Sequence, residues 1–128
     1  MFVMLNCIPS TKYGQSKVSE YSSPNNTYFN KIKYGEFVLD LNLKLKSDST
    51  YILTSCSQIT EGKWKQKNNF IFLECVNKKF IIDSINRDER YSKGKVCNPV
   101  EKFEIKNFGL YKEDVLNKKL IKFVLLKK

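Results

Sequence analysis

Residues 34–82 read YGEFVLDLNLKLKSDSTYILTSCSQITEGKWKQKNNFIFLECVNKKFII, a series of short apolar runs separated by polar turns. From Phe37 to Leu45 every odd position is apolar, which is the two-residue period of a strand with one buried face. Residues 46–49 are turn-type, and residues 50–56 have the β-branched and aromatic content of a partner strand. This stretch therefore predicts an antiparallel hairpin.

The rest of the chain continues the same pattern. Later strands are predicted over residues 59–65, 70–75, 79–83, 101–106 and 120–126. We also expect a weaker strand over residues 27–30, a hairpin loop at residues 76–78 and a short helix over residues 112–119. Because the connections are short, sequential strands should be antiparallel. The predicted fold class is an all-β antiparallel meander of about seven or eight strands, forming a small barrel or a two-layer sandwich.

The length of 128 residues suits a single domain with a real core. We expect residues 1–26 to form a truncated signal or lipid-anchor region with a flexible tether, and residues 27–128 to form one β domain. No apolar run approaches the roughly 20 residues of a membrane-spanning helix. The predicted core consists of Phe37, Leu39, Leu41, Leu43, Ile52, Trp64, Ile71, Leu73, Phe80, Ile82, Phe103, Ile105, Phe123 and Leu125.

The net charge of +10 suggests an acidic partner or nucleic acid. The lysines, however, are spread over almost every segment, and the only arginines are Arg87 and Arg90. Arginine carries the planar fork favoured for phosphate recognition, so this dispersion argues against specific nucleic-acid binding.

The chain contains no histidine, which excludes Ser-His-Asp and Cys-His catalysis and removes the commonest metal ligand. It also lacks the CxxC, HExxH, P-loop and GxGxxG motifs. Carboxylate pairs could support a hydrolase in principle, but exposed carboxylates are the commoner case. We therefore predict no catalytic residues, no metal, no cofactor and no enzymatic activity.

Cys7 follows a short apolar start and precedes a polar, Ser-rich run that extends to residue 26. The arrangement resembles the end of a bacterial lipoprotein signal peptide, in which the cysteine is acylated and becomes the first residue of the mature protein. The resemblance implies lipidation at Cys7. The alternative is an ordinary N-terminal strand with a buried thiol.

Three further cysteines are candidates for a disulfide. Cys56 and Cys75 each end a predicted strand, at positions about 9–10 Å apart in a flat meander, whereas bridged Cα atoms lie within roughly 7 Å. Cys97, in the long segment 84–100, can reach either one, so the connectivity stays open. We expect one bridge in an exported protein and small buried thiols in a cytosolic one.

Four short motifs carry a family resemblance: LKL at 43–45, SDSTY at 47–51, GKWK at 62–65 and NFIFL at 69–73. They resemble the small lipocalin-like β domains of Gram-negative lipoproteins, most of which have no assigned activity. The resemblance implies a β-barrel in the bacterial cell envelope, periplasmic or anchored to the outer membrane, and supplies no catalytic residues.

The main functional hypothesis is thus a non-enzymatic envelope lipoprotein module, anchored to the membrane through Cys7, that binds an unknown ligand or envelope protein. Its first candidate binding residues are Arg87 and Arg90, which lie in a segment long enough to carry function. The other candidate is Trp64, which is either a core residue beside a bulge at Gly62 or a platform for a ligand in a barrel mouth. The alternative hypothesis is a cytosolic basic β module that binds nucleic acid or an acidic protein.

Overall fold

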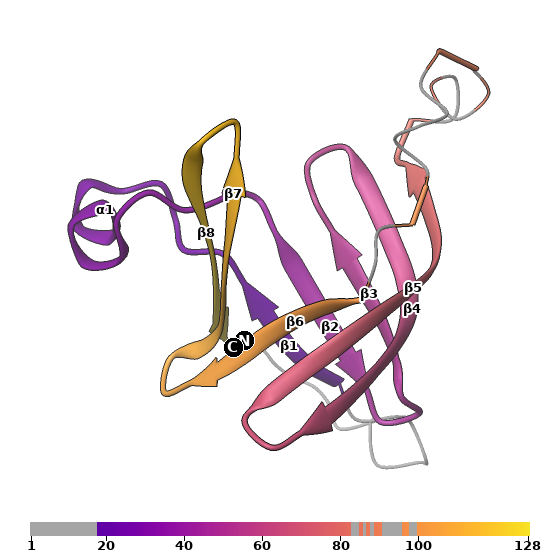
Figure 1. Ribbon diagram of the computed structural model, residues 1–128, viewed down its shortest axis with the longest axis horizontal. Helices are drawn as coiled ribbons and strands as arrows, with labels where there is room; N and C mark the ends of the chain where they lie inside the picture. The colour runs from indigo at the N-terminus through magenta and orange to yellow at the C-terminus, as the bar shows by residue number, and fades with distance from the viewer. Residues whose placement is uncertain (1–17, 83–84, 86, 88, 91–95, 98–99) are drawn as a thin grey trace, which may run out of the picture.

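The computed structural model describes residues 18–82, 85, 87, 89–90, 96–97 and 100–128. Eight strands and one helix appear in the described part of the chain, and the strands close into a barrel in chain order (Figure 1). The elements are β1 (Val18–Ser22), α1 (Tyr28–Tyr34), β2 (Asn42–Lys46), β3 (Thr50–Thr54), β4 (Gln58–Lys67), β5 (Phe70–Phe80), β6 (Glu101–Lys106), β7 (Gly109–Leu116) and β8 (Lys119–Lys127).

Every neighbouring pair of strands is antiparallel. The barrel closes where β1 pairs with β8, through Tyr21 opposite Lys127 and Ser22 opposite Leu126. The prediction of an all-β antiparallel meander is confirmed, and the barrel is the form that the chain adopts.

The barrel interior is filled by alternate side chains of its strands. Six predicted core residues are buried there: Leu41, Leu43, Ile71, Leu73, Phe103 and Leu125. Leu45, Tyr51 and Leu110 join them, while Trp64, Ile105 and Phe123 pack against this cluster as partly buried residues. Tyr51 takes the inward place that the sequence assigned to its neighbour Ile52.

Two predicted core residues, Leu39 and Ile82, are wrong because they lie outside strands. Leu39 is 39% exposed, since Asp40 has a φ of 60° and the regular strand begins only at Asn42. Ile82 follows the end of β5 and is 57% exposed.

The predicted boundary after residue 26 is too late in the chain. Val18–Ser22, which the sequence placed in a tether, is strand β1 of the barrel. The strand predicted over residues 27–30 is helical instead. Thr27 caps α1 by accepting a hydrogen bond from the Asn30 backbone N–H (3.2 Å), and Gly35, with a φ of 78°, ends it.

The helix predicted over residues 112–119 is a β-hairpin. Asn117 and Lys118 both have positive φ, 53° and 64°, as in the two-residue turns that match the twist of paired strands. Lys112 faces the interior of the barrel, where it pairs with Phe123. Because a charged residue takes this inward position, the apolar–polar alternation of a strand is hidden in the sequence.

Residues 76–78 are part of one continuous strand and not a hairpin loop. In the β4–β5 ladder, Gly62 lies opposite Cys75 and Glu61 lies opposite Asn77, which leaves Val76 without a partner. This β-bulge lies at Gly62, where the sequence suggested one. After the bulge, each β5 side chain points to the opposite face of the sheet from the one that strict alternation would give.

The two ends of the barrel differ. One end carries the tight turns at residues 47–49, 68–69 and 107–108. The other carries the β3–β4 turn at residues 55–57 and the β7–β8 turn, and we call it the mouth. The segment after α1 lies beside β8, where the Val38 N–H donates to the Lys122 carbonyl (3.0 Å). The ring of Tyr34, the last residue of α1, contacts the ring of Phe108 in the turn before β7. Figure 1 shows α1 on this side of the barrel, away from the end of β5.

Candidate functional site

A cavity of ≈ 150 Å³ lies inside the barrel at its mouth. Leu41, Leu53 and Leu73 form its apolar wall. Its polar lining consists of Tyr51, Ser55, Gln58, Thr60, Lys78 and Glu101, together with Cys75. An apolar wall combined with a few converging polar groups is the usual composition of a ligand site.

The bulge at Val76 decides which β5 side chains reach this cavity. Strict alternation from Cys75 would turn Asn77 and Lys79 inward. With Val76 bulged, Lys78 pairs with Thr60 instead and faces the interior, while Asn77 and Lys79 face outward. The Asn77 amide accordingly donates to the carboxylate of Glu61 on the outer surface (3.3 Å).

Lys112 lies among acidic and aromatic side chains of the interior. Its Nζ lies 2.8 Å from Glu101 Oε1 and 3.1 Å from Asp114 Oδ2, and its side chain is 13% exposed. The same ammonium lies over the rings of Phe103 and Phe123, at 5.4 and 4.7 Å from their centroids. These contacts compensate the charge of a largely buried lysine and hold the Glu101 carboxylate in place.

Lys78, in contrast, has no ion-pair partner among the residues that the structure describes. It is half-buried and shares the cavity with Leu53, Leu73 and Thr60. A half-buried ammonium beside apolar side chains favours an anion, because burial makes an uncompensated charge costly.

The buried Tyr51 side chain lines the cavity and is neutral. Burial raises the pKa of Tyr51 to about 12, and the negative charges of Glu101 and Glu74 act in the same direction. The phenol therefore stays protonated at neutral pH and remains a hydrogen-bond donor.

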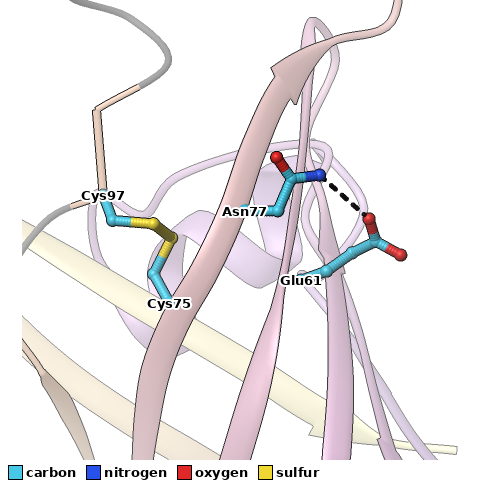
Figure 2. Close-up of a disulfide and its surroundings, with 4 residues drawn as sticks. All are labelled: Glu61, Cys75, Asn77 and Cys97. Carbon is cyan, nitrogen blue, oxygen red and sulfur yellow. Dashed lines mark hydrogen bonds between the residues drawn. A yellow bond between two sulfur atoms is a disulfide. The ribbon is translucent and has the colours of Figure 1, made fainter.

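Of the candidate cysteines, Cys75 and Cys97 form a disulfide with a Cα–Cα distance of 5.5 Å. Figure 2 shows the bridge on one side of β5 and the Asn77–Glu61 pair on the other, the arrangement that the bulge produces. The bridge links Cys97, which lies between β5 and β6, to Cys75 in the wall of the cavity. Cys56 is a free, exposed thiol in the β3–β4 turn.

The other predicted site residues lie elsewhere. Trp64 packs against the core, and its Nε1–H donates to the Lys46 carbonyl (2.8 Å), so it is fixed toward the end opposite the mouth. Arg87 and Arg90 are exposed beyond β5 and are not in the described lining of the cavity. Cys7 lies outside the described residues.

Sequence reasoning missed Lys78, Glu101 and Lys112, which are the charged residues of the site. Glu101 lies in a predicted strand, but its charge suggested an outward position. For Lys112 the sequence does hold a signal. Lys112 lies two residues after Leu110, which pairs with Leu125 inside the barrel, so it takes the next inward position of the same strand.

A second polar surface lies on the outside of β4 and β5. Lys63, Lys65 and Lys67 project outward from alternate positions of β4, and Phe72 and Phe70 lie opposite the last two. The Phe rings are 6.5 Å apart, and a groove of ≈ 480 Å³ runs along the three lysines and Phe72. We call these five residues the lysine row.

Within the described part of the chain, no group of His, Cys, Asp and Glu residues is arranged to hold a metal ion. No described helix is long and apolar enough to cross a membrane. Comparison with protein-family models, with curated proteins and with solved structures found no match to this chain.

Proposed function

We propose that this protein is a non-enzymatic, exported binding module whose barrel mouth takes a small carboxylate ligand with a short apolar tail. The observation that carries the proposal is the position of Lys78, a half-buried ammonium in a cavity that Leu53 and Leu73 also line. The carboxylate would pair with Lys78 and the tail would lie against the leucines. Glu101 is already paired with Lys112, so it does not neutralise Lys78.

Two features support export to the bacterial cell envelope. The Cys75–Cys97 disulfide suits an oxidising compartment. The sequence around Cys7 resembles a lipoprotein signal peptide, which supports a lipid anchor at that residue. The eight-stranded barrel also agrees with the lipocalin-like resemblance, on which the envelope assignment partly rests.

The size of the cavity limits the ligand. A volume of ≈ 150 Å³ equals that of an engineered cavity that binds benzene, and corresponds to about five water molecules. Butyrate and valerate are of this size. The same site would take the carboxylate end of a larger molecule that extends out of the mouth.

The proposal is tested by titrating the protein with valerate and recording backbone amide chemical shifts. We expect saturable shifts at Thr60 and Leu73, and none with valeramide, which has the same shape without the charge. Lys78→Gln should weaken binding by about tenfold or more, because removal of a charge-assisted hydrogen bond costs roughly 1.5–3 kcal/mol.

Lys79→Gln is the matched control, because Lys79 is the next residue of β5, is exposed and faces outward. This substitution should leave valerate binding unchanged within about twofold, since salt screens the charge of an exposed side chain that faces away from the cavity. Equal binding of valerate and valeramide, or equal loss in both lysine variants, would refute a carboxylate site at Lys78.

The lysine row favours a second candidate function, the binding of single-stranded nucleic acid. Lysines at alternate positions of a strand are about 6.8 Å apart, and bases stack on aromatic side chains beside such basic grooves. Lys102 adds a further ammonium 4.6 Å from the centroid of the Phe70 ring.

Under this second candidate, a labelled single-stranded oligonucleotide should bind with an affinity that falls steeply as salt rises. The triple variant Lys63→Gln, Lys65→Gln, Lys67→Gln should reduce the slope of log K against log salt by about 2, since each phosphate contact contributes about 0.7. The control variant Lys31→Gln, Lys33→Gln, Lys119→Gln removes the same charge elsewhere. Equal effects of the two triples would indicate only unspecific attraction.

A further inference from the structure

Helix α1 exposes its most apolar side chains. Tyr28, Phe29 and Ile32 are 82%, 70% and 68% exposed, and the helix buries none of its residues. Positions 28, 29 and 32 lie on one side of a helix, because position 32 is four residues from 28 and three from 29, and residues at these spacings share a face. A helix on a protein surface ordinarily turns such a face toward the core.

The helix is held without these three side chains. The Asn30 side chain donates to the Asn25 carbonyl (3.0 Å), the Gly35 N–H donates to the Lys31 carbonyl (2.9 Å), and the Tyr34 ring packs edge-on against Phe37 and Phe108. The stability of the fold therefore does not explain why this face of α1 is apolar. A contact between the face and a partner outside the barrel would explain it.

The surroundings of this face are basic. Lys31 and Lys33 lie in the last turn of α1, and no acidic residue lies in its first turn. The tip of the β7–β8 hairpin adds Lys118 and Lys119, and its cross-strand pair Val115 and Leu120 is 72% and 48% exposed. Lys119 Nζ lies 4.0 Å from Glu36 Oε1, just after α1, so the tip and the helix belong to one side of the barrel.

We propose that α1, with the adjoining hairpin tip, docks on the surface of an anionic lipid bilayer. Tyr28, Phe29 and Ile32 would enter the interfacial region while the lysines meet the negative headgroups, the combination that characterises interfacial helices. This function goes beyond ligand binding at the mouth. It is also independent of an acyl chain at Cys7.

The size of the face favours a bilayer over a second protein copy. Three side chains at these exposures offer roughly 450 Å². A stable protein interface needs about 800 Å² from each partner, with matching shape. A lipid surface adapts to the side chains that enter it, so a few apolar anchors surrounded by lysines are sufficient.

The test uses the 128-residue chain carrying Cys7→Ser, so that acylation plays no part, and vesicles that are sedimented to measure the bound fraction. Vesicles of equal parts phosphatidylglycerol and phosphatidylcholine should bind the protein, and vesicles of phosphatidylcholine alone should not. The variant Tyr28→Ser, Phe29→Ser, Ile32→Ser should lower the partition coefficient about tenfold or more, with an unchanged melting temperature. Lys31→Gln with Lys33→Gln should lower it as well, most strongly at low salt.

The control variant Val76→Ser, Ile81→Ser, Ile82→Ser removes three exposed apolar side chains of β5 and of the two residues that follow it, and it should bind vesicles as the parent does. The proposal is overturned if the parent ignores anionic vesicles, or if the α1 and β5 variants bind equally well. It is also overturned if sedimentation equilibrium finds a dimer that the α1 substitutions abolish, because a second copy then covers the face.

Discussion

A chain that begins at Ser23 is expected not to fold, whereas a chain that begins at Val18 keeps all eight strands. β1 pairs with β2 through five residue pairs and closes the barrel against β8. Its Tyr21 packs against the core, and Glu20 accepts a hydrogen bond from the Asn42 side chain (2.7 Å). Without β1, two strand edges and the interior open to water, and a small barrel has little stability to spare.

Far-UV circular dichroism and thermal unfolding of the two chains measure this difference. The chain from Val18 should unfold in one cooperative transition, and the chain from Ser23 should show none. A cooperative transition in the shorter chain would mean that β2 and β8 close the barrel without β1, and would restore the tether boundary after residue 26.

Gly62→Ala is expected to destabilise the protein by about 3 kcal/mol or more, which lowers the melting temperature by roughly 10 °C. A Cβ at this position would collide with the Glu74 backbone carbonyl and lie 2.9 Å from Cε1 of the Tyr51 ring. Neither group moves easily, because Glu74 belongs to the β4–β5 ladder and Tyr51 is fully buried. Relief requires separation of the strands at the bulge.

Lys63→Ala is the control for this substitution, since Lys63 is the next residue and projects into solvent. Its effect on the free energy of unfolding should stay within about 0.5 kcal/mol. If Gly62→Ala were equally mild, the close contact between Gly62, Tyr51 and Glu74 would not be a feature of the folded protein. Loss of valerate binding in Gly62→Ala without unfolding would indicate that the bulge itself controls the mouth.

The sequence predicted most of the strands because their inward positions are apolar. β6 matches its predicted range, residues 101–106, and the closing strand over residues 120–126 lies within β8. These strands alternate apolar and polar residues or are continuously apolar, and both patterns are typical of buried strands. The number of strands and the barrel follow from such runs and from the short turns between them.

The failures concern positions where tertiary contacts override the local pattern. Lys112 is tolerated inside the barrel because Glu101, Asp114, Phe103 and Phe123 surround it, and none of these partners can be assigned from the local sequence. The bulge at Val76 depends on its pairing with β4 and therefore appears in sequence only as a glycine. The site is built from these irregularities, so its residues were the least predictable.

A crystal structure of the protein with valerate would show directly whether Lys78 holds a carboxylate at the barrel mouth. The expected result is a carboxylate oxygen about 2.7–3.2 Å from Lys78 Nζ, with the tail against Leu53 and Leu73 inside the mouth. A mouth that remains without ligand while valerate pairs with Lys63, Lys65 or Lys67 on the outer face of β4 would contradict it.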